Sequence, residues 1–88
     1  MIKSIDIVEK IEFINPETNQ VEDYDSIIGF YKSSTNKLLG KVFRKINPDI
    51  WYFIPEPDSN LEFIKIPPYT GGYAKLYEIV SQNIKNQK

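Results

Sequence analysis

The apolar residues of three neighbouring segments, 38–46, 50–54 and 61–66, fall at both even and odd positions. Successive side chains of a β-strand point to opposite faces, so a sheet built from these segments is apolar on both sides. One helix covers only one face, and an antiparallel sheet normally turns polar residues to the other. The segment 50–54 shows the pattern most plainly, with Trp51 and Phe53 on one side and Ile50, Tyr52 and Ile54 on the other. The fold must therefore bury a second apolar face.

The chain has three ways to bury that second face. The sheet can curl into a small barrel, or the N-terminal strand or the polar loop 15–25 can fold across it. The third way is cover by another molecule, either a second copy of the chain or a partner protein. At about 25 cal/mol per Å2, covering about 400 Å2 contributes roughly 10 kcal/mol before the costs of association, which is enough for stable binding.

Cover by another molecule gives the functional hypothesis of a docking surface on the sheet. We expect this surface to centre on Tyr52, with Ile54, Ile64 and Ile66 around it. Tyr69, in the loop before the C-terminal segment, is a further contact candidate, because tyrosine is enriched at protein interfaces.

Alternating and helical periodicities place the other elements. Residues 4–14 alternate apolar and polar and predict a strand, although a helix with Ile7, Val8, Ile11 and Ile14 on one face competes. The other expected elements are a polar loop at 15–25, strands at 26–32, 38–46, 50–54 and 61–66, turns at 33–36, 47–49 and 55–60, and a helix from 73 onward. The fold class is therefore α+β: an antiparallel sheet of four to five strands with one C-terminal amphipathic helix packed on a face, in a single domain 1–88.

Composition argues against catalysis. The 88 residues include no cysteine and no histidine, so a thiolate zinc site and a cysteine or histidine nucleophile are excluded. A pair of carboxylates could still act as in a glycosidase, but so short a chain hardly builds a sugar cleft. We therefore expect a protein that is not an enzyme and uses no cofactor or metal. Glu22, Asp23 and Asp25 form an acidic cluster, but their spacing fits no EF-hand and indicates a solvated loop.

Net charge and apolar runs bear on location. The net charge of −1 gives no overall attraction to DNA or to a membrane surface. The first ten residues mix charged and apolar side chains, unlike a signal peptide, and no apolar run reaches the roughly 18 residues that a membrane helix needs. We expect a cytoplasmic protein without a membrane segment.

An aromatic and basic segment, 30–45, gives the alternative hypothesis of nucleic-acid binding. Lysines that flank an exposed aromatic ring can hold phosphates while bases stack on the ring. Residues 27–54 carry five basic residues and one acidic residue, whereas residues 1–26 carry two lysines and seven acidic residues. The candidate residues are Lys32, Lys37, Lys41, Phe43, Arg44 and Lys45. The competing interpretation is that Phe43 belongs to the core and the lysines protect the sheet from aggregation.

The order of a hairpin, a third strand and a helix is similar to the arm-type DNA-binding domain of phage integrases. The residues that carry the resemblance are Gly40, Val42, Arg44, Trp51 and Ala74. The resemblance would imply DNA binding, but that family is usually basic after its tryptophan-bearing strand, where this chain has the acidic segment 55–58. We therefore assign the chain to no family.

The sequence as a whole predicts a small protein-interaction module, either an accessory factor or an inhibitor. It would bind a protein partner or a second copy of itself through the apolar sheet face, with the acidic loop steering the approach. Ten lysines against one arginine, with frequent isoleucine and asparagine, are typical of AT-rich coding and suggest a phage or mobile-element origin.

Overall fold

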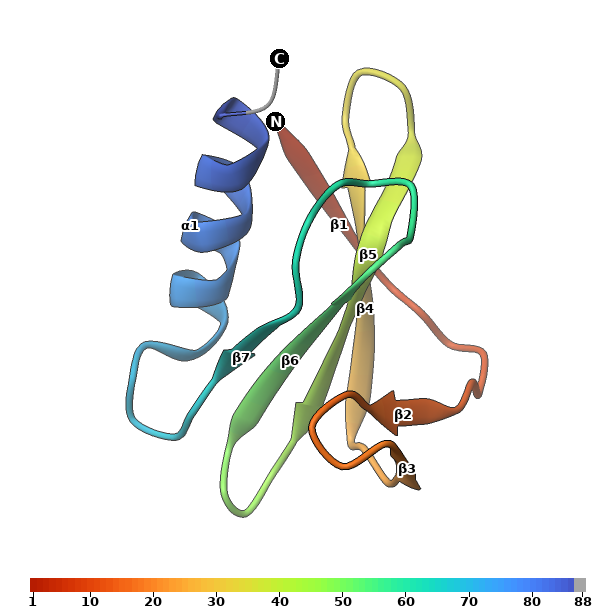
Figure 1. Cartoon of the computed structure of the whole chain (residues 1–88), viewed down its shortest axis with the longest axis vertical. Helices are drawn as coiled ribbons and strands as arrows, with labels where there is room; N and C mark the ends of the chain where they lie inside the picture. The colour runs from red at the N-terminus through yellow and green to blue at the C-terminus, as the bar shows by residue number, and fades with distance from the viewer. Residues whose placement is uncertain (87–88) are drawn as a thin grey trace.

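The computed structural model describes residues 1–86 of the chain. These residues form two antiparallel sheets and one helix (Figure 1). The strands are β1 (Ile2–Asp6), β2 (Phe13–Asn15), β3 (Gln20–Glu22), β4 (Ser26–Lys32), β5 (Lys37–Lys45), β6 (Ile50–Pro55) and β7 (Ile64–Ile66), and the helix is α1 (Gly72–Lys85). The expected α+β class is confirmed.

The larger sheet has five strands in the order β1-β4-β5-β6-β7, and every neighbouring pair is antiparallel. From β4 to β7 the chain runs as a meander, in which short turns join β4 to β5 and β5 to β6 and the longer segment 56–63 joins β6 to β7, while β1 pairs with the outer edge of β4. Asparagine adopts positive φ in the tight turns at Asn36 and Asn47, a conformation that it tolerates better than most residues.

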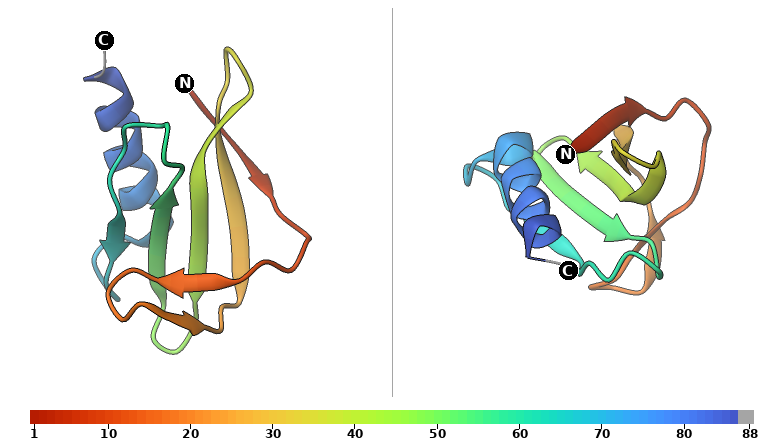
Figure 2. Two further views of the ribbon diagram at one scale, coloured as in Figure 1. Left: turned by 45° about the vertical axis from the view of Figure 1, so that its right-hand side comes forward. Right: turned by 90° about the horizontal axis from the view of Figure 1, so that it is seen from above.

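The helix α1 covers one face of this sheet. It lies alongside β6 and β7 (Figures 1 and 2). Its buried residues Leu76 and Val80 point into a cluster that includes Trp51 and Phe53 of β6 and Ile66 of β7. The apolar side chains at helical spacing on α1 therefore pack against one face of the sheet, as the periodicity predicted.

The opposite face is covered by the chain's own N-terminal part. The small hairpin of β2 and β3 lies across the strands of the larger sheet, as the left view of Figure 2 shows. Phe13 of β2 is fully buried, with its ring 4.6 Å from that of Phe43 and 5.1 Å from that of Tyr52. Of the three arrangements that the sequence allowed, the structure adopts the one in which the N-terminal segment folds across the sheet.

Three predicted elements differ in the structure, and one of them, the expected strand 61–66, is shortened to β7 at Ile64–Ile66. The expected strand 4–14 divides, because the chain must leave the sheet after Asp6 to carry Phe13 over the opposite face. The expected loop 15–25 contains β3, which pairs with β2 through a turn in which Asn19 has a φ of 60°. The second sheet was missed because each of its strands has three residues, too few for a period of two to be recognised.

Removal of the Phe13 ring tests how far the hairpin stabilises the fold. We expect Phe13→Ala to lower the free energy of unfolding by about 3–5 kcal/mol, because it leaves a cavity between two aromatic rings. Urea denaturation followed by fluorescence measures the change. Ile14→Ala, at the neighbouring exposed position, is the control and should change stability by less than about 1 kcal/mol. Similar losses of unfolding free energy in both variants would contradict the conclusion that the Phe13 ring stabilises the packing of the hairpin on the sheet.

Two ion pairs fasten the hairpin to the larger sheet. Lys45 Nζ on β5 lies 2.9 Å from Glu22 Oε1, and Lys65 Nζ on β7 lies 3.0 Å from Glu17 Oε1. Glu22 also accepts hydrogen bonds from Thr18 Oγ1 at 2.8 Å and from the Asn15 amide. These contacts, with Lys45 first, lower the pKa of Glu22 from its ordinary value of 4.5 to about 2.

The lowered pKa of Glu22 predicts an acid-dependent loss of stability. A carboxyl group with a lower pKa in the folded state stabilises the fold above its unfolded value of 4.5, and this contribution is lost as the pH falls towards 2. We expect the stability difference between the wild type and Glu22→Gln to shrink over that interval, measured by thermal unfolding at a series of pH values. Glu62→Gln serves as control and should show no such trend. A constant difference for Glu22→Gln would refute the role of its charge.

Candidate functional site

Residues 7–12 form a linker that carries the chain from β1 to β2 without regular secondary structure. The backbone N–H of Ile7 donates to the carbonyl of Ile27 at 3.1 Å. Further along, the Tyr24 hydroxyl accepts from Ile11 N at 3.2 Å and donates to Ile11 O at 2.8 Å. The Tyr24 ring packs edge-on against Phe43, with 5.1 Å between the centroids. The linker is thus held at both ends, although it belongs to neither sheet.

An open groove of about 810 Å3 lies against this linker, with residues 21–28 lining it as well. We call it the linker groove. Its apolar lining includes Ile11 and Ile27 together with two strongly exposed side chains, Val8 at 95% and Val21 at 59% exposure. Exposed aliphatic side chains that gather in a concave surface are typical of a binding site.

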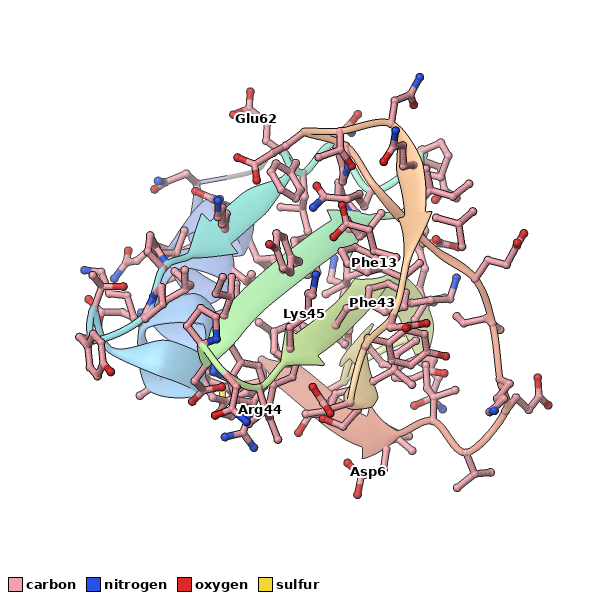
Figure 3. All side chains as sticks on the ribbon, turned by 90° about the horizontal axis from the view of Figure 1, so that it is seen from below. Asp6, Phe13, Phe43, Arg44, Lys45 and Glu62 are labelled. Carbon is pink, nitrogen blue, oxygen red and sulfur yellow. The ribbon has the colours of Figure 1, made fainter. Side chains whose placement is uncertain are left out.

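Carboxylates surround the apolar lining of the linker groove. Those that line it are Asp6, Glu9, Glu12, Glu22, Asp23 and Asp25. Glu22 is engaged with Lys45, and Asp25 accepts a hydrogen bond from Ile46 N at 2.6 Å. Figure 3 shows the Asp6 side chain at the end of β1, directed away from the ribbon. The groove therefore combines an apolar lining with a negatively charged rim.

The surface expected around Tyr52 does not form. In the register of β6 and β7, Trp51 lies opposite Ile66 and Phe53 opposite Ile64, so both isoleucines share the face that the helix covers. Tyr52 points to the other face, where it is buried beneath the hairpin. The half-buried side chain of Ile54 packs on that same side, and Ile64 is half-buried beside the helix cluster. The four residues therefore make two separate cores.

Tyr69 has the accessibility that was expected of it. Its side chain is fully exposed, and its φ of 66° is unusual for a residue other than glycine or asparagine. A hollow of about 430 Å3 beside it is lined by Arg44, by Ile46 to Asp49, and by the loop that leads to α1. Arg44 also lines the linker groove, so the two hollows meet at this residue. Tyr69 remains a candidate contact residue.

The residues of the nucleic-acid hypothesis are mostly engaged within the chain. Phe43 is buried and stacked on Phe13, so its face is closed to a base. Four of the five basic residues form ion pairs, Lys37 with Asp58, Lys41 with Glu56, Arg44 with Asp49 and Lys45 with Glu22. Of the six candidates, Lys32 alone among the described residues is both exposed and outside these contacts. The competing interpretation of Phe43 as a core residue is confirmed.

Arg44 is held by two neighbours. Its guanidinium meets the Asp49 carboxylate through Nε at 2.8 Å and Nη2 at 3.2 Å, and lies over the Trp51 ring at 4.9 Å. The hydrogen bonds that Arg44 donates to Asp49 raise the pKa of Arg44 and lower the pKa of Asp49. The ion pair with Asp49 uses two of the five N–H donors of the guanidinium and neutralises its charge, which weakens its attraction for a phosphate.

Within residues 1–86, no group of three or more histidine, cysteine or acidic residues is placed to hold a metal ion. No helix in this part of the chain combines the length and the apolar character needed to cross a bilayer. The chain matches no protein-family model, no curated protein and no solved structure.

Sequence reasoning missed the linker groove, although two signals pointed towards it. Val8 falls on the polar parity of the segment 4–14, where it stands between charged neighbours. The strong excess of acidic residues in 1–26 was also visible. The interpretation of 4–14 as one strand concealed the first signal, because a continuous strand would have placed Val8 in the solvent-facing row. The second signal was assigned to an acidic loop that steers the approach of a partner.

Loss of the Tyr24 hydroxyl tests how the groove is held open. We expect Tyr24→Phe to keep the ring packing on Phe43 but to release Ile11, because both hydrogen bonds to its backbone are lost. Stability should fall by about 1–2 kcal/mol, and amide hydrogen exchange across 8–12 should become faster. In the control variant, Tyr31→Phe, neither quantity should change. Unchanged exchange in Tyr24→Phe would show that the linker is held by other contacts.

Proposed function

We propose that this chain is a small non-enzymatic protein-interaction module, an accessory factor or an inhibitor, and that it docks its partner in the linker groove. One observation carries the proposal: Val8 and Val21 stand exposed within an open groove, while both faces of the larger sheet are covered by the chain itself. A partner that buries these side chains gains the hydrophobic contribution that folding leaves unused.

The charges favour a protein partner over nucleic acid. The carboxylates around the groove repel phosphates, and most basic residues of the 27–54 segment are neutralised by neighbouring acids. The lack of histidine and cysteine supports a binding role over a catalytic one. A cysteine-free chain folds without an oxidising compartment, and together with the lysine and isoleucine bias this supports a cytoplasmic, phage- or mobile-element-encoded protein.

The test compares what the wild type and a groove variant capture in the source cell. The variant is Val8→Asp with Val21→Asp, two exposed positions where a charge leaves the core intact. Ile14→Asp is the control, because it places a charge on an exposed apolar residue outside the groove. We expect quantitative mass spectrometry to find a partner that is enriched with the wild type and with Ile14→Asp, and reduced at least about tenfold with the groove variant.

Light scattering at two protein concentrations tests whether a second copy of the chain occupies the groove. Self-association of the wild type that the groove variant loses would make a second copy the occupant of the groove. Partners captured equally by all three proteins, with no self-association, would overturn the proposed docking site. Circular dichroism and urea denaturation confirm that each variant is folded before the comparison is made.

A further inference from the structure

The charge that the fold leaves uncompensated is concentrated at the linker groove. Of the twelve acidic residues, Glu17, Glu22, Asp49, Glu56 and Asp58 form ion pairs, which leaves seven that form none within residues 1–86. Five of these seven line the groove: Asp6, Glu9, Glu12, Asp23 and Asp25. Of the lysines that form no ion pair within residues 1–86, Lys10 lines the groove, and those at positions 3, 32, 75 and 85 do not. The groove is therefore negative, although the chain as a whole is nearly neutral.

The five carboxylates are not equivalent. Asp23 raises the pKa of Lys45, after the larger effect of Glu22, and Asp25 raises the pKa of Arg44, after that of Asp49, so both face cations within the chain. Asp6 at the end of β1 and the linker residues Glu9 and Glu12 follow at every third position and have no cation within ion-pair distance among the described residues. Cations supplied by a ligand would meet these three carboxylates first.

The shape of the groove sets a second requirement for a ligand, in addition to its charge. It is open and large enough for several residues of a peptide, and both apolar side chains and carboxylates line it. An extended segment turns alternate side chains to opposite sides, so one set can enter the apolar lining while the other reaches outward to the rim. The hydrogen bonds of Ile7 and Ile11 hold the linker wall in place before binding, which lowers the entropic cost of association.

We infer that the linker groove takes an extended segment of a partner protein in which lysine or arginine alternates with aliphatic residues. The inference rests on the proposed function, since it specifies the segment that docks. Apolar side chains of that segment pack against Val8 and Val21, and its cations pair with the carboxylates of Asp6, Glu9 and Glu12.

Synthetic peptides of one length test the inference with the intact protein. The probes are fluorescein-labelled peptides of sequence KVKIKVK, its acidic counterpart EVEIEVE, and KKVIVKK, which has the composition of the first without its alternation. Fluorescence anisotropy measures affinity at about 10 mM and about 150 mM salt, where surface charges are screened over different distances. We expect the alternating basic peptide to bind best, to weaken as salt rises, and to shift the amide resonances of residues 6–12 and 21–26.

Two variants with identical charge changes separate groove binding from general attraction. Glu9→Gln with Glu12→Gln removes two glutamates of the groove, whereas Glu62→Gln with Glu78→Gln removes two exposed glutamates elsewhere, and none of the four forms an ion pair with another residue of the described range 1–86. We expect the first pair to weaken binding of KVKIKVK by about two- to thirtyfold and the second pair to leave it nearly unchanged.

Several results would overturn the inference. Equal losses in the two variants, or equal binding of KVKIKVK and KKVIVKK, would show unspecific attraction. Preference for the acidic peptide, or a second copy of the chain as the occupant, would identify another partner chemistry. If the valine variants abolish partner capture but no basic peptide binds, the docking site remains and the inferred segment is wrong. Basic peptides could also bind with resonance shifts confined to the groove while the valine variants capture the cellular partner as well as the wild type does. In that case the inferred segment chemistry stands, and the proposed docking of the captured partner in the groove is wrong.

Discussion

The packing of Phe13 on Phe43, where the rings stack, and on Tyr52, where they are tilted, is the contact on which the rest of this structure depends. One helix covers only one face of a sheet, so a sheet with apolar side chains on both faces keeps a second apolar face that something else must cover. Phe13 closes that face from within the chain, helped by Tyr24 and by the ion pairs of Glu22 and Glu17 with lysines of the sheet. The residues that looked most available for a partner, Tyr52 above all, are thereby enclosed.

Closing the second face in this way creates the linker groove. To bring Phe13 across the sheet, the chain has to leave β1 after Asp6 and travel through residues 7–12 outside both sheets. Val8 cannot reach either core from this path and stays almost fully exposed. The same detour places Asp6, Glu9 and Glu12 along one wall, away from the lysines that neutralise acids elsewhere. An exposed apolar and acidic surface is thus a consequence of how the core is completed.

The sequence alone determined the fold class, the strands β4, β5 and β6, the C-terminal helix and the presence of two apolar faces. These features follow from local patterns, since a period of two or of 3.6 residues is visible within a single segment. The basic segment was visible too, but the pairing of Lys37, Lys41 and Lys45 with acids distant in the chain was not.

Only the tertiary structure decided which side of the sheet each strand residue occupies and what covers it. The register that sets Ile66 opposite Trp51 separates it from Tyr52, and a shift of one residue would have reversed this. The contacts of Phe13 with Phe43 and of Glu22 with Lys45 join residues far apart along the chain. Periodicity within a segment carries no information on such pairings, because they depend on how separate segments pack. The groove beside Val8 exists only as a result of that packing.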